Sequence, residues 1–265
     1  MSEREPMRVI VLTCIRRDIA SRCLPALVAN PNIKIACVVL AHGGSPGKSR
    51  IWLRKLHKLW RIGPLGALNG MRMRDWYVDR QAEDIEQVCR GHDVPFVETE
   101  FLNCARTREI FRDANADLGL SLGNGYIAQS VFSIPRFGMV NIHTEILPDY
   151  QGAQSIIWPI HDNVRFTGFT IHQVARKIDA GDILLQERYP IEFRPTLRET
   201  VECNMQRARE LIPQAFSSLC ERYEALRALA TTQSSRKSFT TPSYGQFRRM
   251  VRNNAAMYAE SLPRC

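Results

Sequence analysis

Hydrophobic and polar positions alternate along the first 40 residues in a way that predicts a strand, a helix and a second strand. Residues 7–14 (MRVIVLTC) form a short β-branched run between Pro6 and polar residues 16–18, which is typical of a buried strand. Residues 19–30 carry apolar side chains at helical spacing, and residues 33–40 (IKIACVVL) form a second buried run. The pattern therefore predicts a βαβ unit and the start of a parallel sheet.

The alternation of helix and strand patterns continues along the rest of the chain. The expected helices are 82–91, 104–114 and 196–229, and the expected strands are 94–99, 117–122, 138–143, 167–173 and 182–191. The polar and basic residues 231–254 are expected to form a loop followed by a short helix. These elements predict a doubly wound α/β fold, whose ligands bind beyond the carboxyl ends of the strands.

Residues 48–80 interrupt the alternation with a basic segment. It contains nine Lys or Arg residues against two Asp residues, and its apolar side chains could form one face of a helix. Those apolar residues are Ile51, Leu53, Leu56, Leu59 and Trp60. A solvated helix that covers a sheet edge, a phosphate-binding surface and a membrane-touching surface all fit this pattern.

Composition and charge narrow the class of protein. The chain has 265 residues, 45% hydrophobic residues and a net charge of +9, which excludes a disordered or collagen-like protein. This length fits one large domain with an appendage, and the charge predicts an acidic partner such as nucleic acid, an anionic membrane surface or a small anion. The scattered cysteines and the lack of a signal-peptide pattern or membrane span predict a cytoplasmic protein with reduced thiols and no bound metal.

The candidate chemistry lies in two segments, residues 138–152 and 167–186. Asn141 and His143 are two residues apart, so their side chains share one face of a strand, and Asp179 follows 36 residues later before an Ala-Gly turn. Together these groups could catalyse acyl transfer to an amine. The histidine could take the amine proton, the carboxylate could hold the imidazole tautomer, and the amide could stabilise an oxyanion.

Each of these residues has an ordinary structural interpretation when it is taken alone. Asn141 could be a strand-end residue, His143 a structural histidine and Asp179 a turn former. His172 alternates into a strand and is interpreted as a satisfied sheet histidine. The joint pattern of Asn, His and Asp favours a catalytic site.

The two segments read GxxNxHxxxLPxxxG and TGxTxHxxxxxxDxGDIL, and in this form they resemble the folate-dependent formyltransferases. The resemblance covers roughly residues 7–200 and implies a Rossmann-like formyltransferase fold, with a mostly parallel twisted sheet and helices on both faces. It also implies 10-formyltetrahydrofolate as co-substrate, no metal, and Asn141, His143 and Asp179 as catalytic residues. The residues that match the family's folate pocket are Asn124, Gly125, Tyr126, Ile127, Ala175, Lys177 and Ile178.

Two departures from the family pattern suggest acceptor contacts. Many members have a small residue where this chain has Glu145, and several have Arg where it has Gln151. Because Glu145 is two residues beyond His143, we expect it to face the same pocket and to bind a cationic or hydroxyl-bearing part of the acceptor, with a solvated loop acid as the alternative. The extent of the resemblance also predicts two parts of the chain, a catalytic domain of residues 1–200 and a helical extension of residues 201–265.

The acceptor is expected to be a small amine. Methionyl-tRNA formyltransferases carry a further carboxy-terminal β-barrel, whereas about 65 residues follow residue 200 here, which disfavours nucleic acid as the acceptor. The chain is most similar to bacterial sugar N-formyltransferases, which implies the amino group of a nucleotide-linked amino sugar. The alternatives are an amino-acid amine such as hydroxyornithine, then methionyl-tRNA. A basic nucleic-acid or membrane-binding protein on the same fold is the non-enzyme alternative, and a homodimer is left open.

Overall fold

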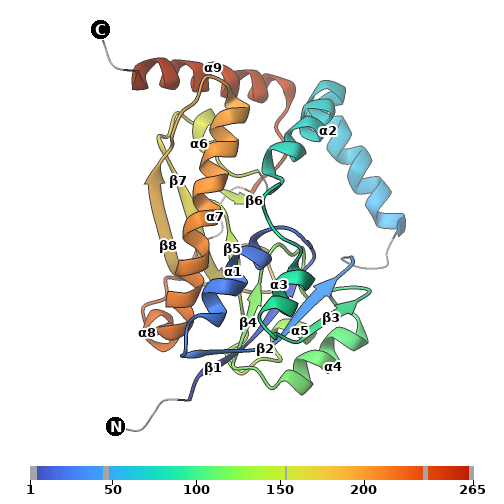
Figure 1. Cartoon of the computed structure of the whole chain (residues 1–265). Helices are drawn as coiled ribbons and strands as arrows, with labels where there is room; N and C mark the ends of the chain where they lie inside the picture. Colours follow the sequence, from blue (N-terminus) through green and yellow to red (C-terminus); the bar gives the residue numbers. More distant parts are fainter. Residues whose placement is uncertain (1–4, 44–47, 153, 235–237, 263–265) are drawn as a thin grey trace.

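One seven-stranded sheet organises the computed structural model, which describes residues 5–43, 48–152, 154–234 and 238–262 (Figure 1). The strand order is β3-β2-β1-β4-β5-β7-β8. The strands are β1 (Met7–Thr13), β2 (Ile33–Ala41), β3 (Phe96–Thr99), β4 (Leu118–Ser121), β5 (Met139–His143), β7 (Phe166–Gln173) and β8 (Ile183–Pro190). Each strand expected from the sequence is present, with bounds that differ by two residues at most.

The sheet is parallel from β3 to β5 and antiparallel from β5 to β8. The antiparallel pairing places Asn141 of β5 opposite His172 of β7. A separate two-stranded parallel sheet joins β6 (Gln151–Gly152) to β9 (Ser238–Phe239). The mostly parallel α/β fold expected from the sequence is therefore confirmed.

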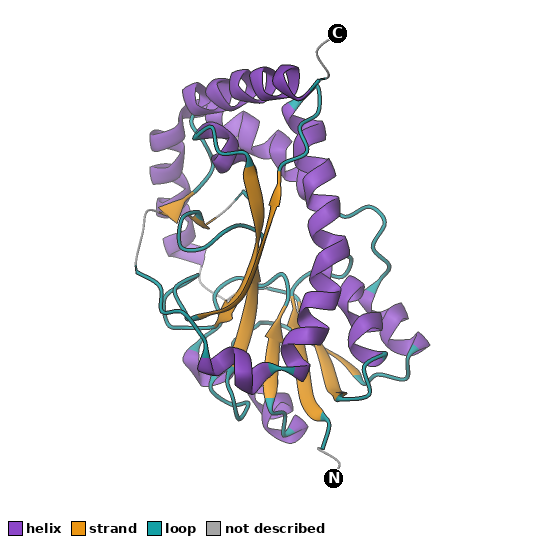
Figure 2. Cartoon of the chain, turned by 90° about the vertical axis from the view of Figure 1, so that its left-hand side faces the viewer, coloured by secondary structure: helices purple, strands orange, loops and turns teal. Residues whose placement is uncertain are grey.

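Helices cover both faces of the main sheet, and Figure 2 shows the long helix α7 running along one side of it. The helices are α1 (Ile19–Val28), α2 (Lys48–Arg74), α3 (Ile85–Gly91), α4 (Ala105–Ala114), α5 (Gln129–Phe132), α6 (Ile157–His161), α7 (Leu197–Glu221), α8 (Tyr223–Ala228) and α9 (Tyr244–Ser261), with a short 3₁₀ helix at Asp75–Tyr77. Buried side chains of α1, α3 and α7 pack on one face of the sheet, and those of α4 and α5 pack on the other. These layers make the two main parts of the core.

The C-terminal helices belong to the body of the molecule. The boundary predicted at residue 200 falls within α7, whose buried Ala208, Ile212 and Phe216 join the core on the face of α1. Helix α9 is longer than the short helix expected. It begins at a capping box between Ser243 and Gln246, and its buried methionines pack in a third cluster with α6 and the start of α7.

The basic segment forms the helix α2, as expected, but the helix bends sharply at Gly63 (φ 72°) before Pro64. The side chains of residues 48–59 lie outside the described residues, so the apolar face predicted for them is not tested. Trp60 is 86% exposed, and Met73 is buried against α6, α7 and α9. The end of α2 is thus anchored to the third core cluster.

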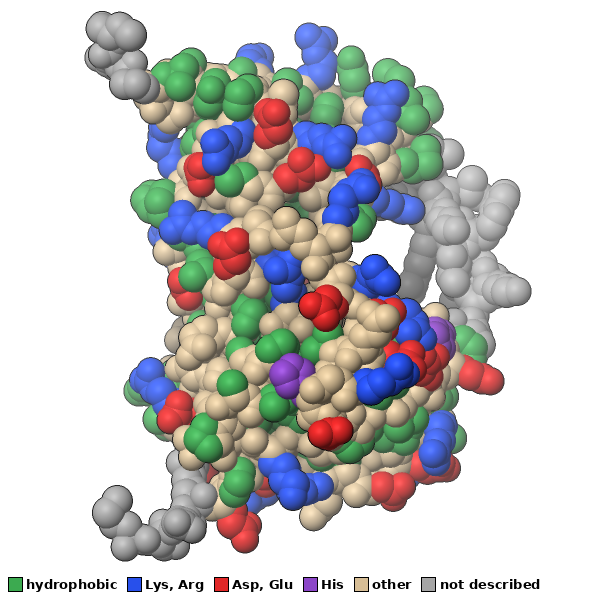
Figure 3. Space-filling view, viewed as in Figure 1, with side chains coloured by type: hydrophobic (Ala, Val, Ile, Leu, Met, Phe, Trp, Pro, Cys, Tyr) green, Lys and Arg blue, Asp and Glu red, His purple; other side chains and the backbone are tan. Residues whose placement is uncertain are grey.

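Charged side chains are mixed on the visible surface. On the face in Figure 3, Lys and Arg side chains lie among Asp and Glu side chains rather than in one continuous patch. The described part of the chain holds no helix that is long and apolar enough to cross a membrane.

Candidate active site

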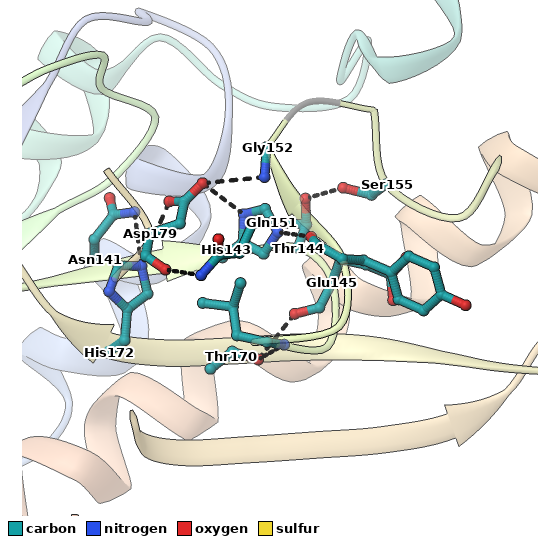
Figure 4. Close-up of polar contacts among 12 residues, drawn as sticks. Asn141, His143, Thr144, Glu145, Gln151, Gly152, Ser155, Thr170, His172 and Asp179 are labelled. Carbon is teal, nitrogen blue, oxygen red and sulfur yellow. Dashed lines mark hydrogen bonds and ion pairs between the residues drawn. The ribbon is translucent and has the colours of Figure 1, made fainter. Parts of the chain in front are cut away.

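Asn141 and His143 share one face of β5, as their spacing predicts, and both turn toward the loop that carries Asp179 (Figure 4). The Nδ1 atom of His143 lies 3.8 Å from Oδ2 of Asp179. His143 is 8% exposed, and its pairing with Asp179 is therefore shielded from bulk water. The structure brings the three predicted catalytic residues together.

A backbone carbonyl sets the tautomer of His143. The Nε2 atom lies 2.7 Å from the carbonyl oxygen of Tyr150, and a carbonyl oxygen only accepts a hydrogen bond, so Nε2 carries the hydrogen. In the neutral imidazole, Nδ1 is then the basic nitrogen, and it is the nitrogen that faces Asp179. The Tyr150 carbonyl therefore holds the tautomer of His143, and not Asp179 as the sequence predicts.

The Asn141 amide is fixed through its oxygen. The hydroxyl of Ser121, at the end of β4, donates to Oδ1 of Asn141 at 2.8 Å. The Nδ2 atom has longer contacts, 3.2 Å to the carbonyl oxygen of Ile142 and 3.4 Å to Nε2 of His172. Because both contacts of Nδ2 are long, Nδ2 is the part of the amide that can exchange one of them for a hydrogen bond to a ligand.

His172 is a member of the site that sequence reasoning missed. It is 2% exposed, its Nδ1–H donates to the carbonyl of Gln173 at 2.9 Å, and its Nε2 atom lies 3.7 Å from Oδ1 of Asp179. Burial lowers the pKa of His172, so the ring is neutral and Nε2 accepts from Asn141. Its position opposite Asn141 follows from antiparallel pairing, which the sequence pattern alone did not reveal.

The turn that carries Asp179 is tightly constrained. Asp179 has a φ of 51°, and its Oδ2 atom accepts from the amide of Gly152 at 3.3 Å. The Gln151 side chain donates to the carbonyl of Asp179 at 3.1 Å. Gly181 approaches β7 so closely that a Cβ there would lie 1.8 Å from the carbonyl oxygen of Gln173. The loop therefore holds Asp179 against His143 by contacts on both sides.

Residues of this group line two cavities. The larger cavity, about 390 Å³, is lined by His143 together with residues from α1, α2 and α7 and with Gly152, Gln154 and Ser155. The smaller cavity, about 100 Å³, is lined by Asn141, His172 and Asp179 together with residues 124–127 and the segment 174–178. The catalytic candidates thus stand between two binding spaces.

All seven residues expected in the folate pocket line the smaller cavity: Asn124, Gly125, Tyr126, Ile127, Ala175, Lys177 and Ile178. Asn124 donates through Nδ2 to the carbonyl of Leu12 at 2.6 Å, while its Oδ1 atom is buried without a hydrogen-bond partner among the described residues. A buried acceptor of this kind fits a ligand that brings an N–H donor, as a pterin ring does.

The two residues expected to contact the acceptor line neither of these two cavities. Glu145 is 2% exposed and accepts hydrogen bonds from the amides of Ile146 and Ile156 and from the hydroxyl of Thr167. Burial raises the pKa of Glu145 to about 7, and these hydrogen bonds act in the opposite direction. Gln151 is 4% exposed and holds the Asp179 loop. The structure does not bring either side chain to an open space.

Arginine and acidic side chains that sequence reasoning missed line the larger cavity. Arg209 of α7 is 6% exposed, donates to the carbonyl of Tyr77 at 2.6 Å, and lies 3.5 Å from Asp79 and 4.0 Å from Asp18. Arg74, at the end of the basic helix α2, lines the same cavity. Their helices are distant in sequence from β5, so no local pattern could identify them.

A family match covers the core of this site. Residues 108–219 match the family described as formyl transferase. The chain is 29% identical over 136 residues to a methionyl-tRNA formyltransferase of Thermotoga maritima, covering 51% of this chain and 44% of that protein. It is 38% identical over 109 residues to the same enzyme of Deinococcus radiodurans, covering 41% and 34%. The chain thus spans less than half the length of these relatives.

Solved structures share the fold. A glycinamide ribonucleotide transformylase of Geobacillus kaustophilus aligns with a TM-score of 0.56 and 17% identity, covering 82% of this chain and 97% of that one. A sugar 3N-formyl transferase, solved with dTDP and 5-N-formyl-THF, aligns with a TM-score of 0.52 and 15% identity, covering 89% and 70%. Among the described residues, no group of three His, Cys, Asp or Glu side chains could hold a metal ion.

Proposed function

We propose that this chain transfers a formyl group from 10-formyltetrahydrofolate to a primary amine, because residues 108–219 match the formyl transferase family. The observation that carries the proposal is the place of Asn141, His143 and Asp179 between the two cavities. The folate would occupy the smaller cavity and the amine the larger one. The bound folate supplies the formyl carbon, and this chain's residues supply the proton transfer and the charge stabilisation.

Each of the three residues has one role in this mechanism. His143 takes the proton of the attacking amine at Nδ1, the nitrogen left basic by the Tyr150 carbonyl. Asp179, 3.8 Å away, stabilises the imidazolium through its charge. Asn141 donates from Nδ2 to the formyl oxygen as negative charge develops on it, and Ser121 keeps the amide in this orientation.

The acceptor that we propose is the amino group of a nucleotide-linked amino sugar. Arg74 and Arg209 at the larger cavity suit the diphosphate of such an acceptor, because one guanidinium group can donate two parallel hydrogen bonds to phosphate oxygens. The fold shared with a sugar 3N-formyl transferase agrees with this choice. The basic helix α2 would then serve the acceptor site through Arg74.

Methionyl-tRNA is the second candidate acceptor. It is favoured by the curated relatives, which match this chain at 29–38% identity and are methionyl-tRNA formyltransferases. The mixed charge on the face in Figure 3 offers no continuous basic surface there for a tRNA.

The experiment is a formyl-transfer assay with a panel of amines. The full chain is incubated with 10-formyltetrahydrofolate and, separately, a dTDP-linked amino sugar, hydroxyornithine and methionyl-tRNA. Tetrahydrofolate release is followed by absorbance, and the formylated product is identified by mass spectrometry. Formylation of the sugar alone supports the proposal. Formylation of another amine would identify that amine as the acceptor in place of the sugar. The absence of any product from the panel overturns the proposal.

The matched control compares two histidines. His143→Ala should reduce turnover by about 100-fold or more, because general base catalysis contributes at least that much. His92→Ala, at an exposed position after α3, should leave turnover unchanged. Equal rates for the two variants would contradict the role assigned to His143.

A further inference from the structure

The buried side chain of Glu145 accepts hydrogen bonds from two backbone amides and one hydroxyl. The amides of Ile146 and Ile156 donate to its two oxygens at 3.0 and 2.7 Å, and the hydroxyl of Thr167 donates at 3.0 and 3.1 Å. Figure 4 shows Glu145 on the opposite side of the group from Asn141. One side chain thus ties both ends of the segment 146–156 to β7.

The far end of this segment has an unfavourable backbone. Gln154 and Ile156 have φ angles of 71° and 73°, and a β-branched residue at positive φ is strained by contact between its Cβ and the backbone. Ile156 is also the residue whose amide donates the 2.7 Å bond to Glu145. The Glu145 oxygen that accepts this bond holds the backbone in this conformation.

Residues between the two tied amides contact His143, Asp179 and the larger cavity. The Tyr150 carbonyl accepts from Nε2 of His143, and the Gly152 amide donates to Asp179. Gln154 and Ser155 line the larger cavity, and the Ser155 hydroxyl lies 2.6 Å from that of Thr144. A shift of this segment would therefore move both the histidine and the wall of the acceptor space.

We propose that Glu145 is a positioning residue, which holds residues 146–152 and 154–156 in place so that Tyr150 orients His143 and Gln154 and Ser155 shape the acceptor cavity. This inference rests on the proposed function, because it assigns the larger cavity to the acceptor. It gives Glu145 no contact with the substrate. Its effect passes through the two tied amides, and none of residues 146–152 and 154–156 lines the smaller cavity.

The first test separates the two substrates kinetically. In Glu145→Gln an NH₂ group replaces one carboxylate oxygen and faces a backbone N–H, so one of the two ties is lost. We expect kcat/KM for the amine that supports turnover to fall roughly 10- to 100-fold, as small misplacements of catalytic groups do. Binding of 5-formyltetrahydrofolate should stay within twofold of wild type. Glu187→Gln, in the neighbouring strand β8, is the matched control and should change neither value.

The second test does not depend on turnover. Amide hydrogen exchange on the full chain should accelerate at least tenfold in peptides covering 146–157 of Glu145→Gln, while peptides from β1 and β4 keep wild-type protection. Thr167→Val removes the hydroxyl tie alone, and it should show a smaller acceleration in the same peptides. It serves as the reporting variant if Glu145→Gln does not fold.

The outcomes distinguish the two proposals. Unchanged exchange at 146–157 or unchanged acceptor kcat/KM in the folded variant overturns the positioning role, and so does a uniform loss of protection across the sheet. A wild-type chain that forms no product with any amine refutes the proposed function, while the exchange measurement still decides whether Glu145 holds the segment.

Discussion

His143 and Asp179 face each other across 3.8 Å, which is longer than a hydrogen bond between a ring nitrogen and a carboxylate. Because the Tyr150 carbonyl already holds the ring, Asp179 is free to act through its charge alone. In the proposed mechanism, its effect appears when the imidazole becomes cationic, during proton transfer from the amine.

Replacing this charge should slow the reaction without disturbing the site. Asp179→Asn keeps the shape of the side chain and removes the negative charge beside Nδ1, so we expect kcat to fall by about 100-fold while folate binding changes little. Steady-state kinetics with both substrates saturating measures the effect. Asp182→Asn, three residues later, is the control, and a wild-type kcat for Asp179→Asn would show that its charge has no part in catalysis.

His172 should orient the Asn141 amide by accepting from Nδ2. His172→Phe removes this acceptor, and we expect kcat to fall by about 10-fold, less than the loss from removing the oxyanion donor itself. His172→Gln offers an acceptor again and should recover part of the rate. The pair is compared by kcat at saturating substrates; equal rates for Phe and Gln variants would rule out the orienting role.

Gly181 should tolerate no side chain. A Cβ at this position would lie 1.8 Å from the Gln173 carbonyl oxygen, so Gly181→Ala must displace β7 or the Asp179 loop. We expect a loss of about 1–3 kcal/mol in the free energy of unfolding, measured by urea denaturation. Gly91→Ala, at the end of α3 with no atom within 4 Å of its added Cβ, should cause no loss. Similar stability of the two variants would contradict this account.

Glu145 should make stability depend on pH near neutrality. Its pKa in the folded chain is about 7, above its ordinary value of 4.5, so the folded state holds a proton that the unfolded state has lost between these values. Stability from this group is therefore present at low pH and is lost as pH rises through about 7. The free energy of unfolding of wild type should fall relative to Glu145→Gln by on the order of 3 kcal/mol from pH 4.5 to 8. A constant difference between the two proteins across this range would exclude the effect.

Local pattern was sufficient for the strands of the main sheet and for the shared face of Asn141 and His143, whereas Asp179 was assigned to the site through the motif that resembles the formyltransferases. The strands are short buried runs, and Asn141 and His143 share a face by their spacing alone. Pattern was insufficient wherever a contact joins distant segments. His172 enters the site through strand pairing, and Arg209 through the packing of α7 on α1.

Glu145 shows why side-chain direction could not be taken from spacing beyond the strand. Two residues after His143, alternation would place it on the same face, but β5 ends at His143 and the chain turns. The carboxylate then meets the amides of Ile146 and Ile156 instead of a cavity. Backbone donors of this kind carry no sequence signature, and neither does the Tyr150 carbonyl.

That carbonyl also limits where protons can travel. Because it occupies the Nε2 side of His143, a proton accepted at Nδ1 has no second nitrogen through which to move on. The ring can therefore accept and release a proton only at Nδ1, and it cannot pass a proton from one ring nitrogen to the other. In the proposed mechanism, each proton taken from an amine would have to leave on the side that faces Asp179, toward the departing folate nitrogen or solvent, before the next cycle could begin.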